Sequence, residues 1–183
     1  MGANTKFLRQ FFKDRQMVGA VAPSTKFLAE KMLKHIDFDK AKVIVELGPG
    51  NGVFTEIMLQ RMSPDAKLFV FELNEEFHKD VAAKINDPRA HIIHDSAENI
   101  EKYVTEAGTA DAVVSSLPLM VFPEELRASV VKAAHTALHE EGNYVQFQYS
   151  LQSKRYLQSI FSKVNIQFTI RNLPPAFVYT CKK

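Results

Sequence analysis

Three acidic residues stand at the ends of three apolar runs, in positions where their carboxylates can hold a ligand. Glu46 lies within VIVEL, Glu72 ends KLFVFE, and Asp95 follows HIIH. Carboxylates accept hydrogen bonds and attract cations. If the runs are neighbouring parallel strands, their carboxyl ends meet at the edge where open α/β sheets bind ligands. The three acids therefore predict a site for a ligand with hydroxyl, amino or cationic groups.

A glycine-rich loop, Gly48-Pro49-Gly50-Asn51-Gly52, follows the first of these acids. Alternate glycines let the backbone turn tightly and approach a ligand that a Cβ would exclude. A dinucleotide-binding loop would read G-x-G-x-x-G, because its third glycine serves helix packing beside a pyrophosphate. Here the pattern is G-x-G-x-G, and Glu46 would repel a pyrophosphate but attract an ammonium or a sulfonium. The loop favours S-adenosylmethionine as the cofactor, with a structural turn that binds nothing as the alternative.

The other two acids are assigned by their positions. Glu72 can accept hydrogen bonds from both hydroxyls of a ribose, and the alternative is a plain surface glutamate. Asp95 can accept from an adenine amino group, and the alternative is helix capping by Asp95 or Ser96. No spacing typical of metal ligands is present, so we expect no metal.

Length and cysteine content restrict the class of protein. A chain of 183 residues fits one domain, and we expect a single domain over 1–183, with N-terminal helices or a lid in 1–36 and a catalytic core in 37–183. The one cysteine, Cys181, supports no disulfide framework and favours a reducing compartment. Because the sequence shows no secretory leader and no apolar run near eighteen residues, we expect neither secretion by that route nor a membrane span.

The net charge of +2 conceals a strong asymmetry. Residues 1–34 carry +5, residues 151–183 carry +6 without a single acid, and residues 35–150 therefore carry −9. If the two ends of the chain meet in space, they form a basic surface suited to phospholipid headgroups or nucleic acid. The alternative is that both ends are merely solvated.

Apolar runs alternate with helical patterns from residue 42 onward, which predicts a doubly wound α/β fold. The runs near 42–47, 67–72 and 111–115 are almost continuously apolar, as in a parallel sheet covered on both faces. The full set of expected strands is 42–47, 67–72, 90–94, 111–115, 142–149, 163–171 and 175–181. The expected helices are 5–16, 25–35, 52–62, 74–86, 97–105, 123–139 and 152–161.

These segments resemble class I S-adenosylmethionine-dependent methyltransferases, and more narrowly the small bacterial phospholipid N-methyltransferases. The segments that carry the resemblance are FLRQFF and GAVAPS within 7–24, VELGPGNGVFTE at 45–56, VVSSLPLMVFP at 113–123, YVQFQYS at 144–150 and RNLPPAFVY at 171–179. The glycine motif is common to the superfamily, whereas APS, LPL with FP, and NLPPA narrow the family.

The resemblance implies a Rossmann-like sheet of seven mostly parallel strands with the last strand antiparallel, preceded by two N-terminal helices. It also implies that residues 19–24 form a lid over the methionine end of the cofactor. The implied cofactor-binding residues are Gly19, Pro23, Ser24, Glu46, Gly48, Pro49, Gly50, Asn51, Gly52, Glu72, Leu73, Asp95, Ser96, Ala97, Ser115 and Leu117.

The loop after the fourth expected strand bears on the methyl acceptor. Related amino-group methyltransferases often carry Asn or Asp here, followed by Pro-Pro-Tyr or Leu-Pro-Tyr, which holds and stacks a planar base. This chain has Ser115-Ser116-Leu117-Pro118-Leu119 instead, without the amide or acid and without the aromatic ring. A base would lose its hydrogen bonds and its stacking platform, whereas a flexible lipid amine such as phosphatidylethanolamine needs neither. Residues 119–122 then predict a wall for acyl chains, with core packing under the next helix as the alternative.

Three residues are candidates for catalysis. Methyl transfer to an amine is an in-line displacement that depends on positioning, and the amine must first lose its proton. Tyr149, at the end of the fifth expected strand, is the candidate for orienting or deprotonating it, and Ser115 and Ser116 would hold the donor side. His94 is an alternative base, although a structural histidine is the simpler reading.

The N-terminal segment completes the prediction. On a helix, four apolar residues of 7–12 cluster beside four basic side chains of 6–15, as in an interfacial helix on anionic lipid. We therefore expect a cytoplasmic monomer held at the inner face of the membrane, with an ordinary docked helix as the alternative. Two rival functions remain: an rRNA adenine N6-methyltransferase, and a non-catalytic module of the same fold that binds membrane or nucleic acid.

Overall fold

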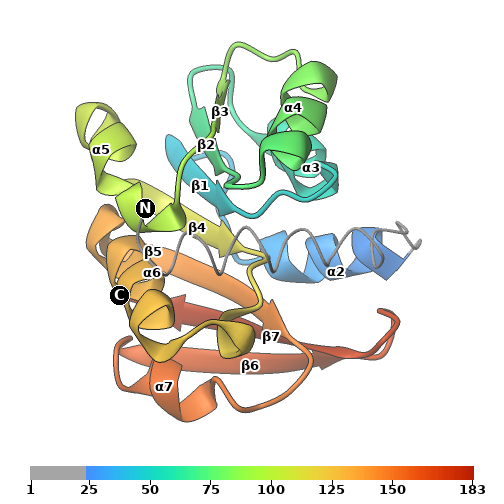
Figure 1. Ribbon diagram of the computed structural model, residues 1–183, viewed down its shortest axis with the longest axis vertical. Coiled ribbons are helices and arrows are strands. Elements are labelled where there is room, and N and C mark those ends of the chain that lie inside the picture. The colour runs from blue at the N-terminus through green and yellow to red at the C-terminus, as the bar shows by residue number, and fades with distance from the viewer. Residues whose placement is uncertain (1–23) are drawn as a thin grey trace.

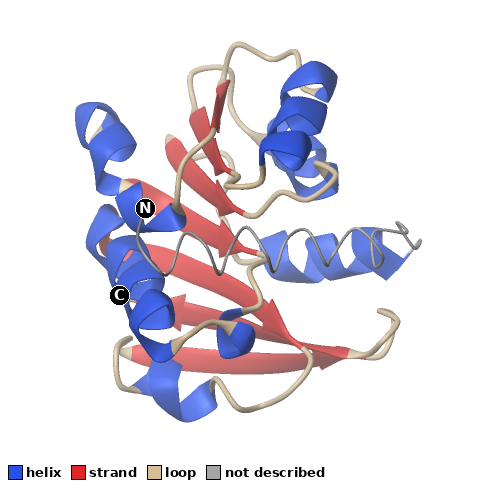
Figure 2. Ribbon diagram, in the orientation of Figure 1, coloured by secondary structure: helices blue, strands red, loops and turns tan. Residues whose placement is uncertain are grey.

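A computed structural model describes residues 24–183. These residues form one seven-stranded sheet with helices on both faces (Figures 1 and 2). The strand order is β3-β2-β1-β4-β5-β7-β6, so the direction of winding reverses between β1 and β4. The strands are β1 (Val43–Leu47), β2 (Lys67–Phe71), β3 (Ala90–Ile93), β4 (Ala110–Ser115), β5 (Leu138–Gln148), β6 (Lys163–Thr169) and β7 (Ala176–Lys182).

The direction of each strand determines which loops share an edge of the sheet. The first five strands pair in parallel, and β7 is antiparallel to both β5 and β6. The predicted doubly wound, mostly parallel sheet with an antiparallel last strand is therefore confirmed. Since β6 runs in the same direction as β5, the β6–β7 hairpin turns at the carboxyl ends of the parallel strands.

Alternate residues of the central strands pack into two separate hydrophobic cores, one on each face of the sheet. Val45 and Leu47 of β1 pack with the face that carries α5 (Glu101–Val104), α6 (Glu124–Ala137) and α7 (Lys154–Gln158). Ile44 packs with the opposite face, which carries α2 (Ser24–Leu33) and α3 (Val53–Arg61). All five residues of β1 are buried, and apart from Glu46 they are apolar, as expected of a parallel strand covered on both faces.

Local signals fix several helix ends. α4 (Glu75–Lys84) begins after Asn74, whose side chain accepts hydrogen bonds from two backbone N–H groups of the first turn. α6 begins after Pro123, and Glu124 and Glu125 complement the positive end of the helix dipole. These starts lie within one residue of the predicted ones.

Other boundaries differ from the predictions. The helix expected at 97–105 is broken into η2 (Ala97–Asn99), α5 and η3 (Thr105–Ala107). β5 begins at Leu138 rather than 142, because Leu138 pairs with Ala110 and a shift in register follows. The chain thus passes from α6 into β5 without the loop that the sequence suggested.

The second expected N-terminal helix, 25–35, is found as α2, whereas the first, 5–16, lies outside the described residues. Within residues 24–183, no helix has both the length and the apolar character needed to cross a bilayer.

Candidate active site

A pocket lies at the carboxyl edge of the parallel strands, beside the point where the strand order reverses. It is open to solvent, and its empty space, which includes part of that open solvent, is about 310 Å³. Its lining includes seven of the predicted cofactor-binding residues, namely Gly48, Glu72, Leu73, Asp95, Ser96, Ala97 and Leu117. Because these residues follow four different strands, it is the parallel topology that brings them together.

The glycine loop between β1 and α3 has the conformation that its sequence requires. Gly48, Gly50 and Gly52 have φ angles of +71°, +58° and +79°, in the left-handed region that L side chains rarely adopt. A Cβ on Gly48 would also lie 2.8 Å from Cδ2 of Leu117, whereas a Cβ on Gly50 would meet no atom within 4 Å. Gly48 is therefore needed for close packing with the loop after β4, and the open space at Gly50 leaves the backbone accessible to a ligand. Pro49 and Asn51 lie between these glycines and do not line the pocket.

Glu46 lies in β1 beneath this loop and is completely buried. Its Oε2 accepts a hydrogen bond of 2.6 Å from the Thr55 hydroxyl, while its Oε1 has no hydrogen-bond partner among residues 24–183. Burial raises the pKa of Glu46 to about 8, the Thr55 hydroxyl opposes that rise, and the charge of Glu72 adds to it. The carboxyl is mostly protonated at neutral pH, and a cation bound beside it would favour the ionised form.

Glu72 and Asp95 follow the next two strands. Glu72 is almost fully buried, and its Oε1 accepts from the backbone N–H of Asn74 at 2.8 Å. Asp95 accepts from the side chains of Asn99 and Tyr103 at 2.8 and 3.0 Å. Burial alone would raise the pKa of Asp95, but these bonds and one from the backbone N–H of Ser96 hold it below its usual value. Asp95 is therefore a fixed, ionised acceptor at the pocket wall.

The residue that caps the short helix η2 is Ser96, the neighbour of Asp95. Ser96 Oγ accepts from the backbone N–H of Glu98 at the start of η2. The capping alternative thus describes Ser96, while Asp95 accepts side-chain hydrogen bonds at the pocket.

The turn after β4 is held by buried polar groups. The Leu117 carbonyl accepts from the side-chain amides of Gln146 and Gln148 on β5, at 2.8 and 3.4 Å. Ser115 is fully buried, and its hydroxyl accepts from the backbone N–H of Leu117 at 3.3 Å. The Leu117 carbonyl thus has two amide donors, and Ser115 is not in the lining of the pocket.

The prediction of an acyl-chain wall at residues 119–122 is wrong for two of its members. Leu119 and Phe122 are buried in the core beneath α6, as the alternative reading required, because η4 (Leu119–Val121) folds back under that helix. Phe122 reaches the pocket from this core. Val121 alone of these residues is largely exposed, with 55% of its surface accessible.

The candidates for catalysis, and the alternative base His94, are not in the lining of the pocket. Tyr149 follows β5 at the same edge, is 54% exposed, and packs edge-on against Phe147 at 5.6 Å between ring centroids. Ser116 is partly buried, and its backbone N–H donates to Leu47. His94 is bonded to the Leu73 carbonyl at 3.0 Å, which supports the structural reading of this residue.

Some of the predicted cofactor-binding residues lie outside the part of the chain that the structure describes. Gly19 and Pro23 lie outside residues 24–183, and Ser24 is described only as the first residue of α2. Within the described part of the chain, no three His, Cys, Asp or Glu side chains are grouped so that they could hold a metal ion.

The structure also adds residues that sequence reasoning missed. Phe71 and Val130 complete the apolar wall of the pocket, Thr55 holds Glu46, and Tyr103 holds Asp95. Phe71 had a local signal, since it directly precedes Glu72 at the end of a strand. Tyr103 and Val130 had none, because their helices reach the site only through tertiary packing.

The arrangement fits a ligand that carries hydroxyls, a flat ring and a positive charge. Glu72 and Asp95 offer acceptors at the pocket wall, the almost fully buried ring of Phe71 is part of the lining, and Glu46 beneath the glycine loop has an oxygen without a partner among the described residues. An S-adenosylmethionine molecule has each of these groups, so the residues present fit that cofactor.

Comparison with known proteins agrees with this assignment of the cofactor. Residues 44–142 match a family model described as a methyltransferase domain. The chain is 29% identical over 180 residues to an ornithine lipid N-methyltransferase of Singulisphaera acidiphila, covering 96% of this chain and 94% of that protein.

Solved structures that share the fold include two methyltransferases. A 1,6-didemethyltoxoflavin-N1-methyltransferase of Burkholderia thailandensis, with bound S-adenosylhomocysteine, aligns at a TM-score of 0.77 and 14% identity over 100% of this chain and 91% of its own. An rRNA methylase of Streptococcus thermophilus aligns at a TM-score of 0.61 and 16% identity, over 89% of this chain and 98% of its own. At these identities the likeness concerns the fold.

The matched segment covers more than half of the chain and contains the glycine loop and all three acids of the site. The chain therefore belongs to the methyltransferase-domain family.

Proposed function

We propose that this methyltransferase moves a methyl group from S-adenosylmethionine to an amine of a membrane lipid, with the phosphatidylethanolamine headgroup as the first candidate. The observation that carries the proposal is the turn after β4. Leu119 is buried where base-methylating relatives carry an aromatic ring, and both lone pairs of the Leu117 carbonyl have amide donors. A planar base would find neither a stacking surface nor a free carbonyl at this turn, whereas an aliphatic amine requires neither.

The similarity to an ornithine lipid N-methyltransferase supports a lipid amine as the acceptor. The alignment covers almost the whole of both chains, so it includes the turn after β4 and the β6–β7 hairpin. It leaves the headgroup open, because 29% identity does not fix the residues that select it.

The cofactor is assigned to the pocket by its acceptors. Glu72 binds the ribose hydroxyls, Asp95 accepts from the adenine amino group, and Glu46 carries the charge opposite a bound cation. When bound, S-adenosylmethionine supplies a methyl group activated by a sulfonium. Gly48 brings the glycine loop to the pocket wall, and residues 19–24 remain the expected lid.

The acceptor side is assigned to the loop ends around the pocket. An ammonium has no lone pair, so the amine must be neutral when it reacts, and positioning then supplies most of the rate. Tyr149 orients the neutral amine through its hydroxyl group, and Ser116 holds the donor side. Ser115 acts indirectly, because its buried hydroxyl holds the backbone of the turn.

A test distinguishes the acceptors directly. The purified full chain is incubated with methyl-labelled S-adenosylmethionine and, in separate reactions, with vesicles that contain phosphatidylethanolamine, vesicles that contain an ornithine lipid, and ribosomal RNA. Label in either lipid supports the proposal, and the lipid labelled faster identifies the headgroup. Label in the RNA alone would refute it and favour the rRNA adenine methyltransferase. The Glu72→Ala variant, run in parallel, shows whether labelling depends on the pocket.

A further inference from the structure

Large apolar side chains are exposed on the loops of the carboxyl edge of the sheet. Ile170 and Leu173, in the β6–β7 hairpin, have 76% and 82% of their surface accessible. Val121 after β4 and Leu151 after β5 are about half exposed at the same edge. All four leave the sheet at the edge where the pocket opens, because β4, β5 and β6 run in the same direction.

The tip of the hairpin reverses the usual order of burial. Asn172 is only 5% exposed although it is polar, and its side-chain amide donates to the Pro174 carbonyl at 2.7 Å. Ile170 and Leu173, on either side of it, point outward. An internal hydrogen bond thus fixes a turn that presents two aliphatic side chains to the outside, which is unfavourable in water unless another surface covers them.

The β6–β7 hairpin and α2 lie close together at this end of the molecule (Figure 1), and contacts join them. The Arg171 guanidinium lies over the ring of Phe27 on α2, 5.5 Å from its centroid, and Phe27 is itself 44% exposed. Lys31, also on α2, donates to the Phe168 carbonyl of β6 at 2.8 Å. Two contacts between segments far apart in sequence therefore hold this surface together.

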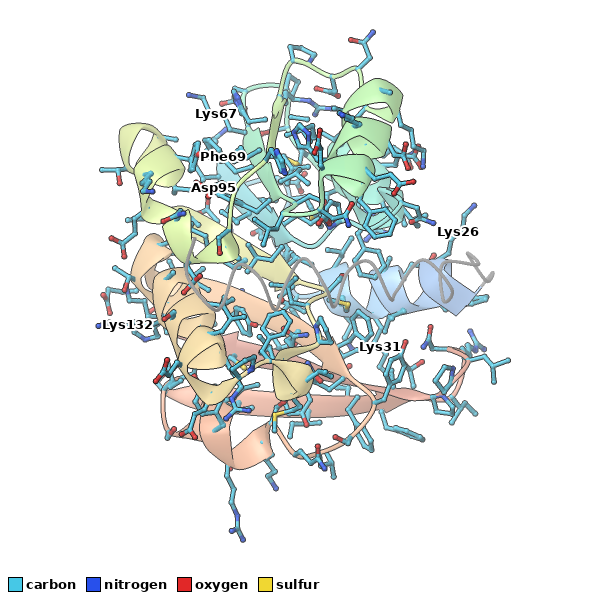
Figure 3. All side chains as sticks on the ribbon, in the orientation of Figure 1. Lys26, Lys31, Lys67, Phe69, Asp95 and Lys132 are labelled. Atoms are coloured by element: carbon cyan, nitrogen blue, oxygen red, sulfur yellow. The ribbon has the colours of Figure 1, made fainter. Side chains whose placement is uncertain are left out.

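The charge of this surface is positive. Arg171 and the α2 lysines Lys26 and Lys31 lie on it, and Figure 3 shows both lysines along α2, on the side of the molecule away from Lys132. α2 contains one acidic residue, Glu30, and residues 151–183 contain no Asp or Glu, so basic side chains outnumber acidic ones in these two segments. Apolar tips beside cations match a bilayer of anionic lipid, in which phosphates and acyl chains lie next to each other.

We propose that this surface, formed by Ile170, Arg171 and Leu173 of the hairpin with Phe27 and Lys26 of α2, docks on an anionic phospholipid bilayer. The proposal rests on the proposed function, because a lipid amine at the bilayer surface then lies beside the edge where the pocket opens. The two most exposed apolar side chains of this surface, Ile170 and Leu173, are aliphatic and cannot stack on bases, and the Phe27 ring already carries the Arg171 guanidinium over its face, so a membrane fits this surface better than RNA. Docking here lets the acceptor remain in the membrane while its headgroup is methylated.

The test compares variants of the full chain in sedimentation with vesicles of phosphatidylglycerol mixed with phosphatidylcholine. The double variant Ile170→Ser with Leu173→Ser is expected to bind at least about tenfold more weakly, equivalent to about 1.4 kcal/mol. Arg171→Glu is expected to weaken binding at low salt and less at high salt, where screening already removes that part. Lys163→Glu is the matched control, since it makes the same change of charge at the opposite end of β6 and should leave binding unchanged.

The outcomes separate docking from catalysis. Unchanged vesicle binding by the double variant, or equal losses for Arg171→Glu and Lys163→Glu, would overturn the docking surface. Methylation of phosphatidylethanolamine dispersed in detergent is measured for the same proteins, and it should be unchanged in the double variant because no bilayer is involved. If the parent protein methylates no lipid while the vesicle results hold, the proposed function fails and the docking surface stands. Arg171-dependent binding of ribosomal RNA that displaces the vesicles would overturn the membrane as its partner.

Discussion

Replacement of Glu46 by glutamine should stabilise the free protein at alkaline pH and at the same time weaken cofactor binding. Glu46 is fully buried, and its pKa rises from an ordinary value of 4.5 to about 8. Below the lower value, both the folded and the unfolded chain hold the proton. Between the two values only the folded chain holds it, so the stability of the parent protein falls as the pH rises through this window. Above about pH 8 both forms are ionised, and the loss is complete.

The size of the effect follows from the same pKa shift. The complete loss is on the order of 5 kcal/mol. A glutamine does not ionise and keeps an acceptor for the Thr55 hydroxyl. Its NH₂ group takes the buried position at which Glu46 Oε1 has no partner among residues 24–183, and an unmade bond there costs about 1–3 kcal/mol. The net gain at high pH is therefore about 2–4 kcal/mol, or roughly 5–15 °C in melting temperature for a chain of this size.

The assay is thermal unfolding of both proteins between about pH 5 and pH 9. The variant should melt near or below the parent at the acidic end and well above it at the alkaline end. Calorimetric titration with S-adenosylmethionine should show the opposite order, with affinity of the parent rising over this range as Glu46 ionises and affinity of the variant low and flat. Two melting curves that stay parallel at every pH would refute the argument, because Glu46 would then not change its protonation in this range.

Three further predictions test the site and its surroundings. Glu72→Ala should weaken S-adenosylmethionine binding at least tenfold by calorimetry, since hydrogen bonds to a charged acceptor are worth about 1.5–3 kcal/mol each; unchanged affinity, or tight NAD binding by the parent, would exclude the assigned role. Gly48→Ala should cost about 1–3 kcal/mol in urea unfolding, because φ is +71° and the new Cβ would lie 2.8 Å from Leu117; a neutral result would mean that the loop relaxes without strain. Leu119→Ala should cost about 2–5 kcal/mol and Val121→Ala less than about 0.5 kcal/mol, and equal small costs would restore the acyl-chain wall at this turn.

The sequence by itself determined the elements and the edge at which they act. The apolar runs specify buried strands because each strand buries its residues against helices of both faces, and that pattern is local in sequence. A parallel sheet then places the residues that follow Leu47, Phe71 and Ile93 at a common edge, whichever helices cover it. This is why the sequence alone predicts that the glycine loop, Glu72 and Asp95 lie at one site. The glycines of the loop likewise predict a left-handed backbone, because glycine adopts positive φ angles more readily than other residues do.

Only the tertiary structure decided how the groups of that edge are used. The pKa of Glu46 depends on complete burial and on the hydrogen bond from Thr55. The pKa of Asp95 depends on hydrogen bonds from side chains of η2 and α5. The turn after β4 could have faced lipid or core, and the outcome was set by how η4 folds under α6. The apposition of Phe27 and Arg171 joins segments more than a hundred residues apart. Burial, acidity and shared surfaces are sums over neighbours that a linear sequence does not specify, so they follow only once the chain has packed.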